Sequence, residues 1–329
     1  MALATVRSCA LDGVRPRPIT VEVHIGGGLP GMSIVGLPNS AVREARDRVR
    51  AALSHLGFRM PQVKVTVNLA PADVPKDGGR FDLPIALGLL LATRQLPAGC
   101  LDSMVVVGEL GLGGELRSVP GALPVALSLY GSDDTLLLPA TCVEEAALAS
   151  RTPLLWADSL DAAVAALRER RAGVTGGRAR CRPYAGSPGS GTAADADAPD
   201  MSDVIGQPAA RRALEIAAAG GHALLMHGAP GTGKSMLARR LPGLCPPLSE
   251  GEALELASIR SVAGLPMETV DRHVRAYRAP HHTASAAALV GGGCGFANLM
   301  RLVRIICEPV RELPTASRLR HVSGGALPV

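Results

Sequence analysis

Aromatic residues and lysines are scarce in this sequence. Phe, Tyr and Trp together make up 2% of the 329 residues, so a folded interior must be built mainly from Ala, Val and Leu. Of the 34 basic residues only three are lysines, and chemistry that needs an amine must use Lys64, Lys76 or Lys234. With 47% apolar and 19% charged residues, the composition is that of a globular protein and excludes a disordered or fibrous chain. The net charge of +5 permits an acidic partner such as a nucleic acid but does not require one.

Long apolar runs and paired cysteines are also missing. The longest uninterrupted apolar stretch, Leu83 to Ala92, has about half of the roughly 20 residues that a membrane-spanning helix needs. The N-terminus lacks the basic region followed by an apolar region that a signal peptide requires. The seven cysteines are scattered and contain no C-x-x-C pair, which indicates reduced thiols rather than disulfides or a zinc site. We therefore expect a cytoplasmic protein that does not enter a membrane.

A change of composition divides the chain into two parts. Between Gly173 and Asp200, the residues Gly, Ser, Pro, Ala and Asp replace the apolar periodicity, which is typical of a flexible linker. The length of the chain corresponds to about two domains. We therefore expect one folded domain at 1–172, a linker at 173–200 and a second domain that begins at residue 201.

The first domain alternates between strand patterns and helix patterns. Strands are predicted where apolar residues alternate with polar ones or form short runs, at 19–25, 63–69, 104–107 and 136–138. Helices are predicted from a cap at Asn39 or Ser40 to about Leu56, and at 83–94, 122–130, 143–149 and 160–171. This order of elements predicts an α/β fold with a mixed sheet.

A glycine-rich motif for phosphate binding opens the second domain. Residues 228–235 read G-A-P-G-T-G-K-S, which matches the P-loop pattern G-x-x-x-x-G-K-[ST] at every position. Glycines let successive backbone N–H groups converge on phosphate oxygens, and the following helix adds its positive N-terminal end. The predicted nucleotide-binding residues are Gly228, Ala229, Pro230, Gly231, Thr232, Gly233, Lys234 and Ser235.

Two side chains of this motif carry the ligand chemistry. Lys234 would supply a positive charge to the β- and γ-phosphates of ATP, and the hydroxyl of Ser235 would hold Mg²⁺. The flanking pattern supports this interpretation, with a helix predicted at 207–219, a buried strand at 223–226 and a helix from about Gly233. The alternative is a glycine-rich turn with an incidental lysine. We expect ATP and Mg²⁺ as cofactors.

The segment ahead of the P-loop narrows the class of nucleotide-binding protein. Residues 203–207 read D-V-I-G-Q and resemble the segment beside the adenine in AAA+ ATPases. The resemblance implies that Ile205 and Gly206 pack beside the base. Taken alone, the segment is also compatible with a simple helix N-cap at Asp203.

Two longer motifs are more specific. One reads N-L-A-P-A-D-V-P-K-D-G-G-R-F-D-L-P-I-A at 68–86, and the other reads R-A-P-H-H-T at 278–283, with S-A-A-A-L-V-G-G-G shortly after it. Together they resemble the magnesium-chelatase-like ATPases of the competence protein ComM (YifB) group, and the resemblance covers residues 1–293 apart from the linker. It implies a first domain of Lon-protease-like fold, in the ribosomal protein S5 domain 2-like class, followed by a P-loop AAA+ domain. It also implies a homo-oligomer, a hexameric motor that migrates branched DNA during natural transformation.

The first domain departs from the Lon family at the catalytic positions. Peptidases of that family place a nucleophilic serine shortly after a P-K-D-G segment, and here Arg80 stands in the place of that serine after residues 75–78. A catalytic lysine is expected further on, but no lysine lies between Asp77 and Gly233. Because a serine nucleophile needs a base within hydrogen-bond reach, we expect a scaffold or an interaction domain without peptidase activity.

Two sets of residues allow both a functional and a purely structural interpretation. His281 and His282 would either ligate a metal or make loop and substrate contacts, and adjacent histidines rarely share one metal. Arg43, Arg46 and Arg50 recur along one helix, either as a phosphate-contacting surface or as a solvated face with intrahelical ion pairs. Both interpretations stay open on the sequence alone.

The resemblance ends at Gly293. A complete ATPase of this class continues with an apolar Walker B strand that ends in Asp-Glu, then a sensor and an arginine finger, and none is recognisable in residues 294–329. The nearest sequence is V-R-I-I-C-E at 303–308, where cysteine stands in the place of Asp. We therefore expect a C-terminally truncated family member with an unrecognised tail. Two functions stay open: a DNA-processing ATPase motor, or a nucleotide-binding module that does not hydrolyse ATP because the carboxylates that hold Mg²⁺ and polarise water are missing.

Overall fold

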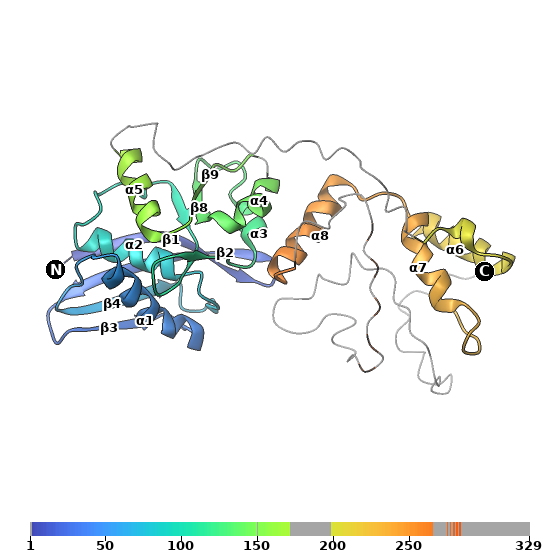
Figure 1. Ribbon diagram of the computed structural model, residues 1–329, viewed down its shortest axis with the longest axis horizontal. Coiled ribbons are helices and arrows are strands. Elements are labelled where there is room, and N and C mark those ends of the chain that lie inside the picture. Colours follow the sequence, from blue (N-terminus) through green and yellow to red (C-terminus); the bar gives the residue numbers. More distant parts are fainter. Residues whose placement is uncertain are drawn as a thin grey trace. The chain divides into compact units, whose positions relative to one another are not determined.

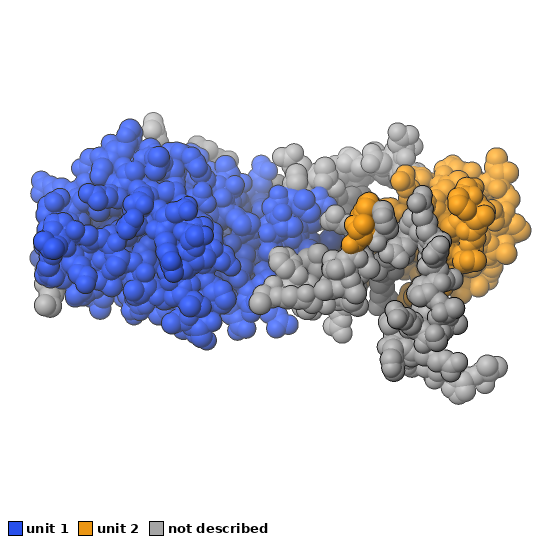
Figure 2. Space-filling view, turned by 90° about the horizontal axis from the view of Figure 1, so that it is seen from below, with its two compact units in different colours: residues 1–192, 254–270, 294–296 blue, residues 193–253, 271–293, 297–329 orange. Residues whose placement is uncertain are grey.

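The computed structural model describes residues 2–149, 151–171 and 199–265, together with residues 275, 277, 279, 281 and 283. Within these ranges the chain forms two compact units (Figure 2). The first unit holds the described residues up to 171 together with 254–265, and the second holds 199–253 and the five single residues. The predicted linker, except for its last two residues, and the predicted tail lie outside the described residues.

A seven-stranded sheet forms the centre of the first unit (Figure 1), with the strand order β3-β4-β2-β1-β5-β8-β9. The strands are β1 (Ala2–Asp12), β2 (Arg15–Gly26), β3 (Gly31–Val35), β4 (Lys64–Ala70), β5 (Met104–Val106), β8 (Thr135–Pro139) and β9 (Leu154–Ala157), and a separate ribbon pairs β6 (Glu109–Leu110) with β7 (Leu116–Arg117). β2 pairs antiparallel with β1 and with β4, whereas β3 and β4 and the neighbours from β1 to β9 pair in parallel. The sheet is therefore mixed and mostly parallel, which agrees with the predicted α/β fold.

The helices of the first unit lie close to their predicted positions. They are α1 (Ser40–His55), α2 (Asp82–Ala92), α3 (Ala122–Ser128), α4 (Val143–Ala146) and α5 (Leu160–Arg171), with 3-10 turns at Ala140–Cys142 and Ala147–Ala149. The side chain of Asn39 caps α1 by accepting a hydrogen bond of 2.9 Å from the N–H of Val42. The predicted strands are β2, β4, β5 and β8, whereas the sequence analysis missed β1, β3 and β9. No helix in the described ranges is both long enough and apolar enough to cross a membrane.

Helix α2 is buried on nearly every side. Of its 11 residues only Leu91 is not buried, and the helix packs against β1, β2 and α1. At Gly88 a Cβ atom would lie only 2.7 Å from Cγ2 of Val23, so the close approach of helix and sheet requires glycine at this position. A helix that is apolar all round must be covered on all sides, and α2 accordingly forms much of the main hydrophobic core.

A buried ion pair joins α2 to α1. The guanidinium of Arg48 donates to both carboxylate oxygens of Asp82, at 2.6 and 3.1 Å. Asp82 is 0% exposed and also accepts a hydrogen bond of 3.2 Å from the N–H of Leu110. Burial raises the pKa of Asp82 to about 6, although the bonds from Arg48 act in the opposite direction. Arg48 thus supplies the counter-charge that this carboxylate needs at neutral pH.

The described part of the second unit is helical. It contains the 3-10 turn η3 (Met201–Asp203), α6 (Pro208–Gly220), α7 (Lys234–Leu244) and the beginning of α8 (Glu250–Val262). The helices predicted before and after the P-loop are confirmed. The strand predicted at 223–226 is wrong, and Leu225 within it is 73% exposed rather than buried. A strand needs a hydrogen-bonded neighbour, and residues 199–265 contain no strand with which this segment could pair.

Helix α8 was not predicted, and its residues from 254 onward belong to the first unit. Ala257 joins a hydrophobic cluster that includes residues of α3 and α4. The backbone oxygen of Ser261 accepts a hydrogen bond of 3.1 Å from the N–H of Gly121, and the hydroxyl of Ser261 contacts the carboxylate of Glu145. This half of α8 is therefore an integral part of the first unit.

We expect Arg48→Met to destabilise the first unit by about 3 kcal/mol at pH 8, because it leaves the carboxylate of Asp82 buried without a counter-charge. The loss should be smaller at pH 5. The pKa of Asp82 in the folded state is already raised and rises further without Arg48, so stability is lost as the pH rises through that pKa. Urea unfolding, followed by the emission of the single tryptophan, Trp156 in β9, measures the free energy of unfolding of this unit.

Arg46→Met is the matched control, since Arg46 is exposed on the same helix and bonds to the neighbouring Asp47. We expect this variant to change the free energy of unfolding by less than about 0.5 kcal/mol. An equal loss in both variants, or a loss in Arg48→Met that does not depend on pH, would contradict the assigned role of the buried pair.

Candidate nucleotide-binding site

The loop of residues 228–233 leads directly into α7, whose N-cap is Gly233. Gly231 and Gly233 have φ angles of +82° and +84°, a backbone conformation that L side chains rarely adopt, so these positions of the motif require glycine. The N–H groups in the first turn of α7 have no acceptor within the helix. Together with the positive end of the helix dipole, they stabilise an anion placed at this loop.

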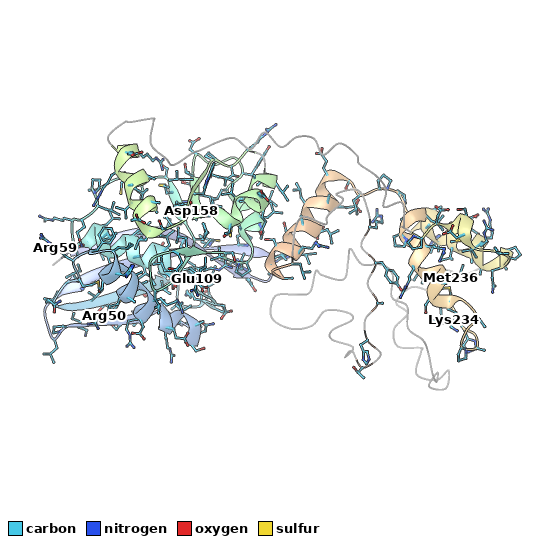
Figure 3. The ribbon with its side chains drawn as sticks, in the orientation of Figure 1. Arg50, Arg59, Glu109, Asp158, Lys234 and Met236 are labelled. Carbon is cyan, nitrogen blue, oxygen red and sulfur yellow. The ribbon has the colours of Figure 1, made fainter. Side chains whose placement is uncertain are left out.

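The ammonium group of Lys234 is held by the same loop. Its Nζ donates to the backbone oxygens of Gly228 and Ala229, at 2.8 and 2.7 Å, and lies 3.3 Å from Oγ1 of Thr232. Ser235 follows in the first turn of α7 and is exposed. Figure 3 labels Lys234 on this part of the second unit. The structure thus brings the charged and hydroxyl groups of the predicted motif together at one helix end.

The predicted adenine-side segment lies next to this loop. Gln207 is the N-cap of α6, and its Nε2 lies 3.5 Å from the backbone oxygen of Thr232. Gly206 has a φ angle of +75°, and Ile205 is 96% exposed. An exposed apolar side chain beside a phosphate-binding loop offers a surface on which an aromatic base can pack.

Arg240 of α7 connects the adenine-side segment to the P-loop helix, and the sequence analysis missed it. Its Nε donates to the backbone oxygen of Asp200 at 2.6 Å, and its Nη2 lies 3.4 Å from Oδ2 of Asp203. Asp203 does not cap α6, as the alternative interpretation supposed. It ends η3 and accepts a hydrogen bond of 3.1 Å from the N–H of Asp200, whereas Gln207 stands at the N-cap position of α6 without a side-chain cap bond.

The histidine motif lies only partly within the described residues. His281 is exposed, and its Nδ1 lies 2.8 Å from Oγ1 of Thr283, whereas His282 lies outside the described residues. In the part of the chain that the structure describes, no group of three or more His, Cys, Asp and Glu side chains is arranged to hold a metal ion. Both interpretations of the two histidines, metal ligation and loop or substrate contact, stay hypotheses.

The basic face of α1 is partly engaged in ion pairs. Arg46 donates to the neighbouring Asp47 at 3.1 Å, while Arg43 and Arg50 are exposed. Arg48, which the sequence analysis did not single out, makes the buried bonds to α2. This arrangement favours the interpretation of α1 as a solvated face with ion pairs.

The described residues around the P-K-D-G segment of the first unit include no activated nucleophile. Arg80, in the place of the expected serine, is 6% exposed, and its Nη2 donates to the backbone oxygen of Pro120 at 2.6 Å. Lys76 is buried, and its ammonium donates to the backbone oxygen of Pro71. Burial raises the pKa of the Cys9 thiol, which lies near Arg80, to about 11. Burial thus disfavours the thiolate, which is the nucleophilic form of cysteine.

Comparisons with known proteins agree with the motifs. The family model for subunit ChlI of Mg-chelatase matches residues 21–141, and the model for magnesium chelatase, subunit ChlI, matches residues 200–298. The YifB proteins of Salmonella typhimurium and Escherichia coli are 48% and 47% identical to this chain over 295 and 293 residues. The competence protein ComM of Haemophilus influenzae is 44% identical over 293 residues. Each of these alignments covers 89% of this chain and 56% of the relative, so the chain spans about half the length of the curated relatives it matches.

The matched regions lie on both sides of the predicted linker and include the two longer motifs, at 68–86 and 278–283. Identity of 44% to 48% over nine-tenths of the chain is too extensive to come from the P-loop alone. The chain therefore belongs to the magnesium-chelatase-like protein family that includes YifB and ComM.

Proposed function

We propose that this chain binds Mg-ATP through residues 228–235 and acts within an AAA+ motor that processes DNA. The observation that carries nucleotide binding is the position of the Lys234 ammonium, within a loop whose glycines have positive φ angles and which leads into a helix N-terminus. The magnesium chelatase ChlI family is an ATP-dependent AAA+ family, which supports ATP and Mg²⁺ as the ligands.

On phosphate binding, the ammonium group of Lys234 would exchange its hydrogen bonds to the loop backbone for hydrogen bonds to phosphate oxygens. The backbone oxygens of Gly228 and Ala229 are neutral acceptors, whereas phosphate oxygens carry charge and form stronger hydrogen bonds with an ammonium group. The exposed hydroxyl of Ser235 fits the preference of Mg²⁺ for oxygen ligands. Bound Mg²⁺ would neutralise part of the phosphate charge.

The adenine would pack on the segment that holds Ile205 and Gly206. Ile205 is 96% exposed, so a base placed against it would remove apolar surface from water. The contact between Gln207 and Thr232, and the bonds from Arg240 to the segment before α6, keep this surface close to the phosphate loop. The site would therefore bind both ends of the nucleotide.

The role in DNA processing follows from the relatives. The Haemophilus influenzae relative is named a competence protein. By the family resemblance we extend to the present chain a role in branch migration during natural transformation, in the cytoplasm and as a homo-oligomeric hexamer. Because the matched relatives are considerably longer than the aligned region, this role is proposed for the whole motor.

A second candidate is a nucleotide-binding module that does not hydrolyse ATP. The observation that favours it is the sequence of residues 294–329, in which no apolar strand ends in Asp-Glu and no sensor or arginine finger is recognisable. An arginine finger alone contributes about 10³ to 10⁵ to the rate in P-loop enzymes, so its loss would suppress turnover even where ATP binds.

Mg-ATP at about 100 times its Kd should stabilise the folded chain by about 2.7 kcal/mol. We expect Lys234→Ala to remove most of this stabilisation, because the phosphate charge loses its compensating ammonium. Lys64→Ala is the matched control, since Lys64 is an exposed lysine at the start of β4 in the first unit. Thermal unfolding with and without Mg-ATP is the measurement, and an equal shift in wild type and Lys234→Ala would reject the site.

For the 329-residue chain we expect nucleotide binding with negligible hydrolysis, because the residues after Gly293 lack recognisable catalytic groups. Steady-state phosphate release, with and without DNA, measures this, and Lys234→Ala provides the blank. DNA-stimulated turnover that disappears in Lys234→Ala would show that this chain supplies catalytic groups that its sequence does not reveal. In that case Glu308 is the first residue to examine.

We expect no peptidase activity from the first unit, because Arg80 occupies the place of the nucleophile and burial disfavours the thiolate form of Cys9. Incubation of the chain with unfolded casein, with and without ATP, should give no cleavage above the buffer level. Cleavage that is lost in Lys76→Ala would overturn this expectation, since Lys76 is the only lysine in the P-K-D-G segment.

A further inference from the structure

The first unit contains an open cavity of about 420 Å³ that none of the sequence motifs contributes to. Three of its lining residues are arginines, Arg59, Arg94 and Arg168, and none of its lining residues is acidic. They come from the loop after α1, the turn after α2 and the last turn of α5. Figure 3 labels Arg59 at the outer edge of this unit. We call this cavity the arginine pocket.

Gln95 holds the walls of the arginine pocket together. Its side-chain amide bonds twice to the backbone of Arg59, because Oε1 accepts from the N–H and Nε2 donates to the oxygen, both at 2.9 Å. Nε2 also donates to Oγ1 of Thr93 at 2.8 Å. The backbone oxygen of Gln95 accepts a hydrogen bond of 2.9 Å from Nη2 of Arg168. The three segments that carry the arginines are thus joined through one residue before any ligand is present.

The backbone of Arg94 supports a role for its side chain. Arg94 follows the C-cap of α2 and has a φ angle of +58°. Helices often end in this conformation, and glycine is the usual residue there because it carries no steric cost. An arginine at this position carries a steric cost that glycine would avoid, and residues with such strain cluster at functional sites.

Among the described residues that line the arginine pocket, no acidic side chain balances its positive charges. Arg94 and Arg168 lie at the C-terminal ends of helices, where the helix dipole contributes about −0.5 of an elementary charge at each end. The two helix ends together offset only a part of the positive charge of the three arginines. Within the described residues, the guanidinium groups of Arg59 and Arg94 make no hydrogen bond or ion pair. Their donors therefore remain available to a ligand.

We propose that the arginine pocket binds a phosphate group of an anionic ligand. Guanidinium groups match phosphate oxygens in geometry and form paired hydrogen bonds with them. The volume of about 420 Å³ lies within the range of small-molecule sites, about 300 to 1,000 Å³. The phosphate belongs either to the backbone of a DNA strand or to a free phosphate compound such as a nucleotide or pyrophosphate. In both cases the guanidinium groups would bind phosphate oxygens.

The test uses the full chain carrying Lys234→Ala, so that the P-loop does not bind the probes. Arg59→Ala and Arg94→Ala are added together, because their side chains make no bonds within the described structure that the fold would lose. Arg43→Ala and Arg50→Ala form the matched control, since both are exposed arginines on α1 of the same unit. Emission of Trp156 verifies that each variant is folded. One probe is a fluorescein-labelled single strand of oligothymidylate, measured by anisotropy, and the other is pyrophosphate, measured by calorimetry.

We expect the change at Arg59 and Arg94 to weaken the binding of at least one probe by about tenfold or more, while the control changes it by less than about threefold. For the DNA strand, the slope of log K against log salt should fall in magnitude by about 1.4, because two phosphate contacts of about 0.7 each are lost. A loss with DNA alone identifies the DNA backbone as the source, and a loss with pyrophosphate identifies a free phosphate compound.

Unchanged binding of both probes in the variant that lacks the side chains of Arg59 and Arg94 would overturn the proposal, and so would two other results. One is the absence of binding of either probe to the Lys234→Ala chain. The other is an equal loss in the control at Arg43 and Arg50, which would reduce the effect to general attraction by positive charge. Either result leaves the thermal-shift test of the P-loop unaffected, because that test compares Lys234→Ala with a chain that keeps all of these arginines.

Discussion

The fold of the first unit depends on the burial of helix α2. Because α2 is apolar on every side, it needs the sheet on one side and α1 on another, and its single charged residue, Asp82, needs a partner inside the core. Arg48 of α1 provides that partner. Both ends of α2 also lie beside cavities: Arg80 lines one of about 310 Å³ just before the helix, and Arg94 lines the arginine pocket just after it. One residue beside each end of α2 thus lines a cavity of the first unit.

The geometry of the P-loop depends mainly on residues that are close in the sequence. Its glycines, its ammonium group and the N–H groups of the first turn of α7 lie within nine consecutive residues, 228–236, so the geometry needs few distant partners. This explains why the loop keeps its form although the predicted strand before it is not formed. The bond from Arg240 to the segment before α6 and the contact between Gln207 and Thr232 extend the site toward the base.

Features that depend on neighbours in the sequence could be predicted, and features that depend on distant partners could not. The cap at Asn39, the buried run of α2 and the P-loop follow from local chemistry. β1 was missed because small residues such as Ser8 and Cys9 fill its buried positions. Ser249 and Glu252 form a capping box that predicts α8, and this signal was overlooked. The arginine pocket could not be predicted, because its arginines come from three separate segments of the chain.

The central claim is that residues 228–235 bind Mg-ATP, and amide hydrogen exchange measured by mass spectrometry tests it most directly. Bound phosphate oxygens would engage the backbone N–H groups of the loop and of the first turn of α7. The account predicts that Mg-ATP slows exchange in peptides that cover residues 228–236, with a smaller effect at 203–207. Unchanged exchange in these peptides at saturating Mg-ATP, or protection confined to the first unit, would contradict it.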